Sequence, residues 1–240
     1  MGEPQVLHSD DHVAWVYKPA GMQVHRQHRA DSGPFLLQWL RDTLGCYVHA
    51  THRLDKPTAG LMLFALSREA ASQIGMAFQE RRARKCYLAL VRGHPADGLI
   101  EYPLRPPRDN LDSRPDTAKA AVTDLRVLQI SEIDRPVGRY QTARYALVEL
   151  QPATGRRHQL RRHLKHIFHP IVGDRKYGDR DHNRFAESLG FTRLALVSTG
   201  LNIPSLDLSH ACLPDSQWRA MGSALGLGLT PPLSVPPESC

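Results

Sequence analysis

The 240-residue chain is poor in cysteine and has no long hydrophobic run, and each absence excludes a class of protein. Its four cysteines show neither the spacing of a metal site nor that of a disulfide framework, which favours a reducing cytoplasm. No apolar run approaches the roughly 20 residues that span a bilayer, and the first residues lack the basic and apolar regions of a secretory signal. We therefore expect a cytoplasmic protein with no membrane partner.

The positive charge of the chain is concentrated in one segment. The formal net charge is +7. Residues 135–184 hold twelve Lys and Arg against four Asp and Glu, whereas the other 190 residues hold nineteen against twenty. Such a basic surface is typical of a polyanion site, because phosphate contacts release condensed counterions. A merely solvated basic face is the alternative. A phospholipid surface fits less well, since the segment lacks the apolar face of an interfacial helix.

Hydrophobic periodicity predicts a mixture of helices and strands, which favours the α+β class. Helices are predicted at 35–45, ending at Gly45, and at 68–82, beginning after the N-cap Ser67. Strands are predicted at 13–17, 61–66, 86–93, 121–130, 143–152 and 193–198. No internal repeat or clear linker divides the chain. We therefore expect a single domain over residues 1–225 and a disordered, proline-containing tail over 226–240.

The segment HRLDKPTAG, residues 52–60, is the first candidate functional site. Pro57 and Gly60 predict a loop, and the apolar run that follows predicts a buried strand. Asp55 is thus placed on a short loop at the start of a strand, where functional side chains are often held by a rigid scaffold. The alternative is a surface aspartate paired with Arg53.

The basic segment TGRRHQLRRHLKHIFHP, residues 154–170, is the second candidate. Leu160, Leu164 and Ile167 form one apolar stripe at helical spacing. Arg161 lies roughly 90° from this stripe and Arg162 roughly 170° from it. We therefore expect Arg162 to face solvent and Arg161 to be half-buried. A half-buried guanidinium needs an acceptor, most naturally a carboxylate held in a bidentate contact.

Four histidines in and beside this segment, at 158, 163, 166 and 169, raise the alternative of a metal site. Three of them are spaced by three residues, with no acidic or cysteine ligand on the same helix. Zinc sites on helices usually pair histidines four residues apart with a glutamate between them. The sequence therefore predicts no metal.

Five groups of short motifs follow one another along the chain: KPAG and VH (18–25), HRLD and TAG (52–60), KCYLA (85–89), TGR and HQLR (154–161) and HPIVGD (169–174). Together they resemble the RluA-type pseudouridine synthases. The resemblance covers about residues 6–200 and includes no S4-like RNA-binding module ahead of residue 6. Within the family, the segments 156–174 and 178–184 and the insertion 138–145 are most similar to the enzymes that modify uridine 65 of tRNA.

The resemblance implies a mixed, mostly antiparallel sheet flanked by helices and loops, with a central RNA-binding cleft. It also implies conversion of uridine to pseudouridine, which needs neither cofactor nor metal. Asp55 would be the catalytic carboxylate, Arg161 would hold it in a direct bidentate ion pair, and Tyr87 would lie against the base and take the C5 proton. The target base must leave the stack, and Arg53 would fill the gap. Further RNA contacts are expected from His52, Arg156, Arg157, Arg162 and Lys165.

Two departures from the family pattern concern Ala59, where serine is usual, and Val197-Ser198, where His-Ala is usual. We expect an RNA partner, most specifically a tRNA, and a monomeric enzyme. Arginines within 131–145 suit A-form RNA, which is read largely through phosphates and 2′-hydroxyls. Three alternatives are the same reaction on ribosomal RNA, a basic RNA-binding protein without activity, and a metal-dependent hydrolase.

Overall fold

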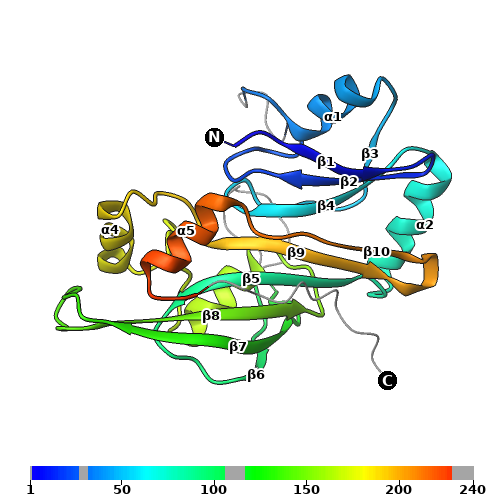
Figure 1. Cartoon of the computed structure of the whole chain (residues 1–240). Coiled ribbons are helices and arrows are strands. Elements are labelled where there is room, and N and C mark those ends of the chain that lie inside the picture. The colour runs from blue at the N-terminus through cyan, green and yellow to red at the C-terminus, as the bar shows by residue number, and fades with distance from the viewer. Residues whose placement is uncertain (1, 27–31, 106–116, 229–240) are drawn as a thin grey trace. The chain divides into compact units, whose positions relative to one another are not determined.

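The computed structural model describes residues 2–26, 32–105 and 117–228 (Figure 1). The chain forms two compact units, and each is described by itself. The first contains the described residues of Met1–Tyr87 and Leu196–Asp215. The second contains those of Leu88–Ala195 and Ser216–Pro231. The chain passes from the first unit to the second inside a strand, so no linker is visible in the sequence.

The first unit is built on a mostly antiparallel sheet. β1 pairs with β2, and β2 with β4, in antiparallel register, whereas β4 and β9 run parallel through the pairs Ala59↔Val197 and Gly60↔Ser198. The short strands β3 and β10 pair with β4 and β9. The strands are β1 (Gln5–Ser9), β2 (Val13–Lys18), β3 (His49–Ala50), β4 (Ala59–Ala65), the start of β5 (Arg84–Arg92), β9 (Leu196–Ile203) and β10 (Leu208–Ala211).

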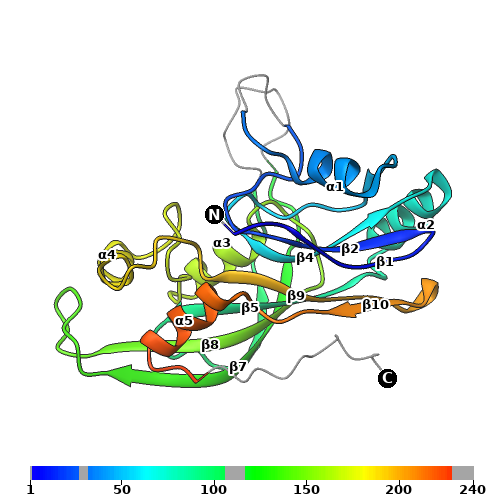
Figure 2. The same ribbon diagram turned by 45° about the horizontal axis from the view of Figure 1, so that its top comes forward.

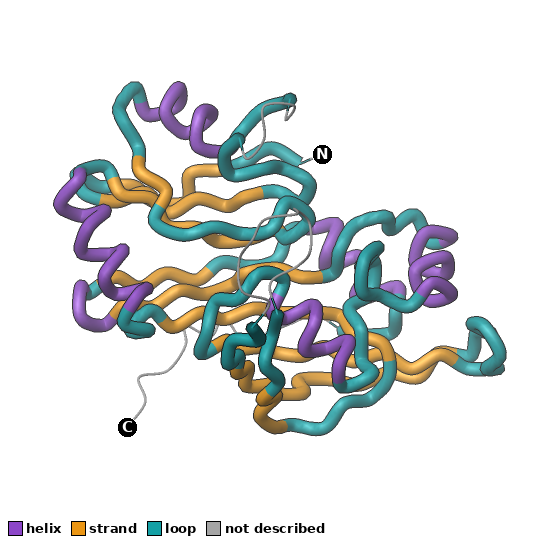
Figure 3. The backbone as a smooth tube through the Cα atoms, turned by 180° about the vertical axis from the view of Figure 1, so that it is seen from behind, coloured by secondary structure: helices purple, strands orange, loops and turns teal. Residues whose placement is uncertain are grey.

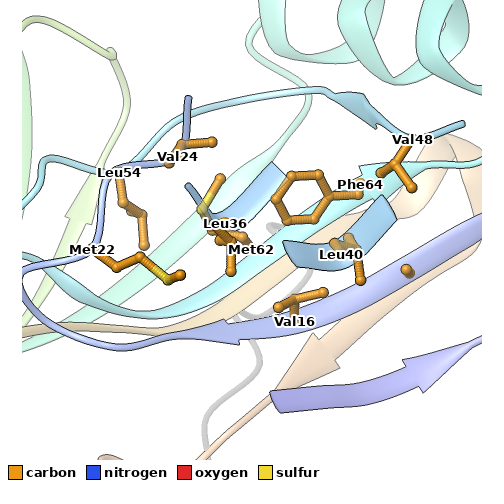
Figure 4. Packing of buried hydrophobic residues seen from close by; sticks show 10 residues of the cluster. Val16, Met22, Val24, Leu36, Leu40, Val48, Leu54, Met62 and Phe64 are labelled. Atoms are coloured by element: carbon orange, nitrogen blue, oxygen red, sulfur yellow. The ribbon is translucent and has the colours of Figure 1, made fainter. Parts of the chain in front are cut away.

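Two α-helices and a short 3-10 helix, η1 (Pro204–Leu206), complete this unit. α1 (Leu36–Leu44) ends at the left-handed Gly45, as predicted. α2 (Arg68–Gln79) is capped by Ser67, whose side chain accepts the Ala70 N–H, and ends three residues before the predicted boundary. Figure 4 shows the core that α1 covers, where Leu54 lies beside Met22 and Val24.

The second unit contains a long antiparallel hairpin and three helices. Its strands are the remainder of β5, β6 (Gly98–Glu101), β7 (Val122–Ile133) and β8 (Ala143–Pro152). Its helices are α3 (Gln159–His166), α4 (Arg180–Ser188) and α5 (Ser216–Ala224). α3 and α5 lie on opposite faces of the strands (Figures 1 and 3). The tip of the β7–β8 hairpin lies beside α4 (Figure 2), where Gly138 approaches the Asp181 carboxylate.

The α+β class and the mostly antiparallel pairing are confirmed, with several corrections. β7 continues to Ile133, three residues past the predicted end of the strand at 121–130. Leu227 is fully buried, so packing continues past Gly226, where the tail was expected to begin. Residues 229–240 lie outside the described part. No helix within the described ranges has the length and hydropathy needed to cross a membrane. The elements missed from sequence are β1, β3, β6, β10, η1, α4 and α5.

Candidate active site

The loop that carries Asp55 is fixed on both sides of that residue. Leu54 is buried in the core of the first unit, 5% exposed. The Thr58 N–H donates to the Asp55 carbonyl at 3.0 Å, closing the turn. The Lys56 carbonyl accepts the Gly21 N–H at 2.8 Å. Asp55 is partly exposed. Its backbone cannot shift without breaking these contacts, so the position of the side chain is fixed.

Lys18 supplies the other contact that holds this loop. Its side chain is fully buried, and its ammonium donates to the carbonyls of Pro19 (3.0 Å), Met22 (2.9 Å) and Lys56 (3.2 Å). A buried ammonium must find acceptors, and these three carbonyls supply them. The lysine of the KPAG motif thus joins the end of β2 to the Asp55 loop.

Gly60 allows the start of β4 to lie very close to β9. Its φ is +115°, and an added Cβ would stand 2.1 Å from the Ser198 carbonyl oxygen. Only glycine fits this approach. Ser198 is 3% exposed, and its hydroxyl is hydrogen-bonded to the side chain of Tyr87 on β5. The close approach therefore places a buried hydroxyl next to the predicted catalytic tyrosine.

The structure brings Tyr87 and Asp55 together within the first unit. Burial and the negative charge of Asp55 raise the pKa of Tyr87 well above its ordinary value, and the hydrogen bond from Ser198 opposes this only in part. Tyr87 is therefore a neutral phenol at neutral pH. The ring also packs against the core cluster that contains Leu54. Two of the three predicted catalytic residues thus share one site.

His52 has a structural role in this site. Its Nε2 accepts the Leu63 N–H at 3.0 Å, and its ring stacks on Phe78 with centroids 4.9 Å apart. Burial, helped by the nearby charge of Lys85, lowers the pKa of His52 to about 3. The acceptor nitrogen of His52 is therefore used inside the protein, and a contact between His52 and RNA stays a prediction. The neighbouring Arg53 is exposed, as a residue that enters RNA would need to be.

Arg161, the third predicted catalytic residue, belongs to the second unit and is more deeply buried than expected. It is 7% exposed, and its Nε and Nη2 donate to the two carboxylate oxygens of Asp174 at 2.7 and 2.8 Å. Its guanidinium carbon lies 5.0 Å from the Tyr177 ring centroid. The guanidinium is thus held in a bidentate carboxylate contact, but the carboxylate is Asp174, whereas Asp55 was expected in that place. An additional contact with Asp55 stays a prediction.

The turn that contains Asp174 keeps its carboxylate ionised and fixed in position for the pair with Arg161. Burial alone would raise its pKa, but the hydrogen bonds and charge of Arg161 and the backbone N–H groups of Tyr177 and Lys176 lower it. The preceding Gly173 has φ +75°, and an added Cβ would stand 1.9 Å from the Arg193 carbonyl oxygen. The HPIVGD motif therefore builds a compact turn around a buried carboxylate.

The remaining predicted RNA contacts fall into two groups. Arg157 and Lys165 are exposed. Arg156 donates through Nε to the Ala120 carbonyl at 3.2 Å, and Arg162 donates through Nη1 to the Arg105 carbonyl at 2.7 Å. Arg162 is only partly exposed, which corrects the expectation that it faces bulk solvent. Both tethered arginines still carry a charge close to the surface.

Three residues of the site were not assigned a role from the sequence. Lys18 and Asp174 stood within the recognised motifs, and Ser198 was noted only as a departure from the family pattern. Glycines were the available signal, since Gly60 and Gly173 stand where the backbone must approach another segment. In the described part of the chain, no three His, Cys, Asp or Glu side chains gather as a metal site would require.

Comparison with known proteins identifies the class to which this site belongs. The family model of RNA pseudouridylate synthases matches residues 12–166, and the chain is a member of that family and an RNA pseudouridine synthase. A solved structure, human RNA pseudouridylate synthase domain containing 4, has a TM-score of 0.72 and 30% identity, covering 93% of this chain and 94% of that one.

Curated relatives carry a more specific name, tRNA pseudouridine synthase C. The protein from Haemophilus ducreyi is 41% identical over 239 residues, covering 95% of this chain and 98% of the relative. The protein from Haemophilus influenzae is 42% identical over 239 residues, covering 92% and 98%. That from Pasteurella multocida is 45% identical over 228 residues, covering 89% and 93%.

Proposed function

We propose that the chain converts a uridine of tRNA, specifically uridine 65, to pseudouridine, with Asp55 as the catalytic carboxylate. The observation that carries the proposal is the Asp55–Tyr87–Ser198 arrangement on a fixed loop in a member of this family. The tRNA substrate is supported by the name shared by the relatives. The choice of position 65 is supported by the resemblance of residues 155–184.

The reaction is an isomerisation in which atoms and charge balance without a cofactor. The bond between N1 and C1′ breaks, the uracil turns, and C5 joins C1′. C5 then loses its proton and N1 gains one. Asp55 supplies a nucleophilic or electrostatic oxygen to the separated fragments. Because its loop is fixed by Lys18 and Gly21, the carboxylate is positioned before substrate arrives.

The resemblance assigns the C5 proton to Tyr87, and the electrostatics oppose that role. A phenol must lose its own proton before it can accept another, and the raised pKa of Tyr87 disfavours this. We therefore propose that Tyr87 packs against the flipped uracil as a neutral phenol, held by Ser198. Its task is to position the base over Asp55.

We also propose that Asp55 accepts a hydrogen bond from Arg161 in the active enzyme. This proposal is supported by the resemblance of the HRLD and HQLR motifs. Asp174 holds the Arg161 guanidinium in a fixed orientation through Nε and Nη2. Arg53 is proposed to fill the gap left by the flipped base, with Arg157 and Lys165 on the phosphates.

The decisive experiment uses unmodified tRNA transcripts with tritium at C5 of uridine, and a second transcript with cytidine at position 65. Release of tritium from the first and not from the second is expected. Equal release from both, or release only from ribosomal RNA, would reject the assignment to position 65. Asp55→Asn should bind the same transcript and release nothing. Turnover by this variant, even at a few per cent of the wild-type rate, would reject a nucleophilic Asp55.

The tritium-release assay and a sedimentation measurement address the other proposals. We propose a monomeric enzyme that works in the cytoplasm as one catalytic domain without metal or cofactor. Turnover should therefore be unchanged by chelators, and the protein should sediment at the mass of a single chain. Inhibition by a chelator would favour the metal-dependent alternative, and binding without turnover would favour a non-catalytic RNA-binding protein.

A further inference from the structure

Phe168, two residues beyond α3 in the second unit, is unusually exposed. Its side chain is 82% exposed, more than any other large apolar side chain in the described part of the chain. It makes no ring contact or cation contact with another described residue. By comparison, Tyr102 in the same unit is 39% exposed and is stacked on His166, with centroids 3.7 Å apart and planes 14° apart. Phe168, by contrast, is largely exposed and has no stacking partner within the described residues.

The backbone of Phe168 is also strained. Its φ is +64°, in the left-handed region that favours glycine and asparagine and is unfavourable for a bulky side chain. The turn is held by two hydrogen bonds, from the Phe168 N–H to the Lys165 carbonyl at 3.1 Å and from the His169 N–H to the Leu164 carbonyl at 2.9 Å. The chain therefore needs a left-handed residue at this point.

The turn accounts for the left-handed backbone conformation of residue 168, but it does not account for a phenyl side chain at this position. After the turn, His169 Nδ1 lies 2.9 Å from the Arg92 carbonyl, and its ring fills the space where a Cβ on Gly93 would stand. Glycine or asparagine at position 168 would deliver His169 equally well and with less strain. A phenylalanine at this position is thus unfavourable in two ways, because its backbone is strained and its apolar ring is exposed to water.

The surroundings of the ring favour an anionic partner. No acidic residue occurs between positions 155 and 173, and Lys165 and His166 beside the turn are exposed. An apolar protein partner would gain little from this charge, whereas RNA offers both phosphates and aromatic faces. Aromatic side chains on basic surfaces are the usual platforms on which unstacked bases are bound.

We propose that Phe168 is a stacking platform for an unstacked nucleobase of the bound RNA. The inference rests on the proposed function, in that the substrate is taken to be RNA. The phenyl ring receives the face of the base while Lys165 meets a neighbouring phosphate. The site increases the affinity for RNA and takes no part in bond breaking, so it acts on KM and leaves kcat unchanged.

Three substitutions separate the ring from the strain. Phe168→Ala removes the ring, Phe168→Asn removes the ring and relieves the strain, and Phe168→Trp keeps both. Loss of one stacked base should raise the Kd for an unmodified tRNA transcript by about 5- to 150-fold. We expect this loss for the alanine and asparagine variants, with unchanged kcat at saturating tRNA, and wild-type affinity for the tryptophan variant. The melting temperature of the asparagine variant should rise, so weaker binding would accompany a more stable protein.

Leu99→Ala on β6 is the matched control, since Leu99 is 66% exposed in the same unit. It should change neither Kd nor KM. Wild-type affinity in both Phe168→Ala and Phe168→Asn overturns the proposal, as does a change of oligomeric state without a change in Kd. If the wild-type protein modifies ribosomal RNA and not tRNA, the proposed function fails separately. The same variants measured on that RNA then decide the role of the ring.

Discussion

The acid sensitivity of His52 offers a sharp test of the active-site description. In the folded protein its pKa is lowered from 6.5 to about 3, because the ring is buried and lies near Lys85. In the unfolded chain the histidine takes up a proton as the pH falls below 6.5, whereas the folded protein does not do so until about pH 3. The contribution to stability is therefore complete above pH 6.5 and is lost progressively as the pH falls to 3.

Each pH unit below the unfolded pKa removes about 1.4 kcal/mol of stability, so the loss from this one residue reaches about 2 kcal/mol at pH 5. His163, His182 and His210 also have lowered pKa values and act in the same direction. The contribution of His52 must therefore be isolated by a variant. His52→Gln is suitable, because its side-chain oxygen can still accept the Leu63 N–H and does not titrate.

Urea unfolding of both proteins at pH 7.5 and pH 5 measures the effect. The variant should be less stable than the wild type at pH 7.5, since it loses the stacking on Phe78. Between pH 7.5 and pH 5 the wild type should lose about 2 kcal/mol of stability more than the variant, so the difference between the two proteins becomes smaller or changes sign. An equal loss of stability in both proteins would refute the neutral, buried His52. An NMR titration in which this imidazole gains its proton near pH 6.5 would refute it directly.

Three further substitutions test the contacts that support the site. Gly60→Ala should lower the free energy of unfolding by more than about 1 kcal/mol, because φ is +115° and the new Cβ meets the Ser198 carbonyl; wild-type stability would contradict the close approach. Ser198→Ala should lower kcat by about two- to tenfold through the lost hydrogen bond to Tyr87, and an unchanged kcat would remove Ser198 from the site. Asp174→Ala should destabilise the protein by about 3–5 kcal/mol in urea unfolding, since it leaves Arg161 buried and unpaired; a loss below about 1 kcal/mol would show that the pair is solvated.

Elements with local signals could be predicted from the sequence, and those without them were missed. α1 and α2 carry a C-cap glycine and an N-cap serine, and both were found within a few residues. α4 is capped by Asp179, but only His182 and Ala186 are buried on it, so it shows no apolar stripe. Its position is fixed by tertiary contacts, which a sequence pattern does not contain.

The features of the candidate site also divide into those that could be predicted from the sequence and those that could not. The inward position of Arg161 follows from helix geometry alone, and so does its need for a carboxylate. Its partner Asp174, thirteen residues further along the chain, depends on a turn whose shape is fixed by Gly173 and Asn183. His52 stands in a motif associated with RNA, and the structure adds a packing role that the motif does not reveal, its stacking on Phe78. Its contact with RNA stays a prediction.

The three carbonyls around Lys18 have a consequence for the order of folding. The Asp55 loop takes its shape from partners far from it in the sequence, 38 residues earlier in the case of Lys18 at the end of β2. A peptide containing only residues 52–60 therefore lacks the contacts that hold this conformation. During refolding, activity can return only after β2 has paired with β4 and the ammonium has been enclosed. The recovery of turnover thus reports the folding of the first unit. Acylation of Lys18 during refolding would label those molecules in which its ammonium is not yet buried.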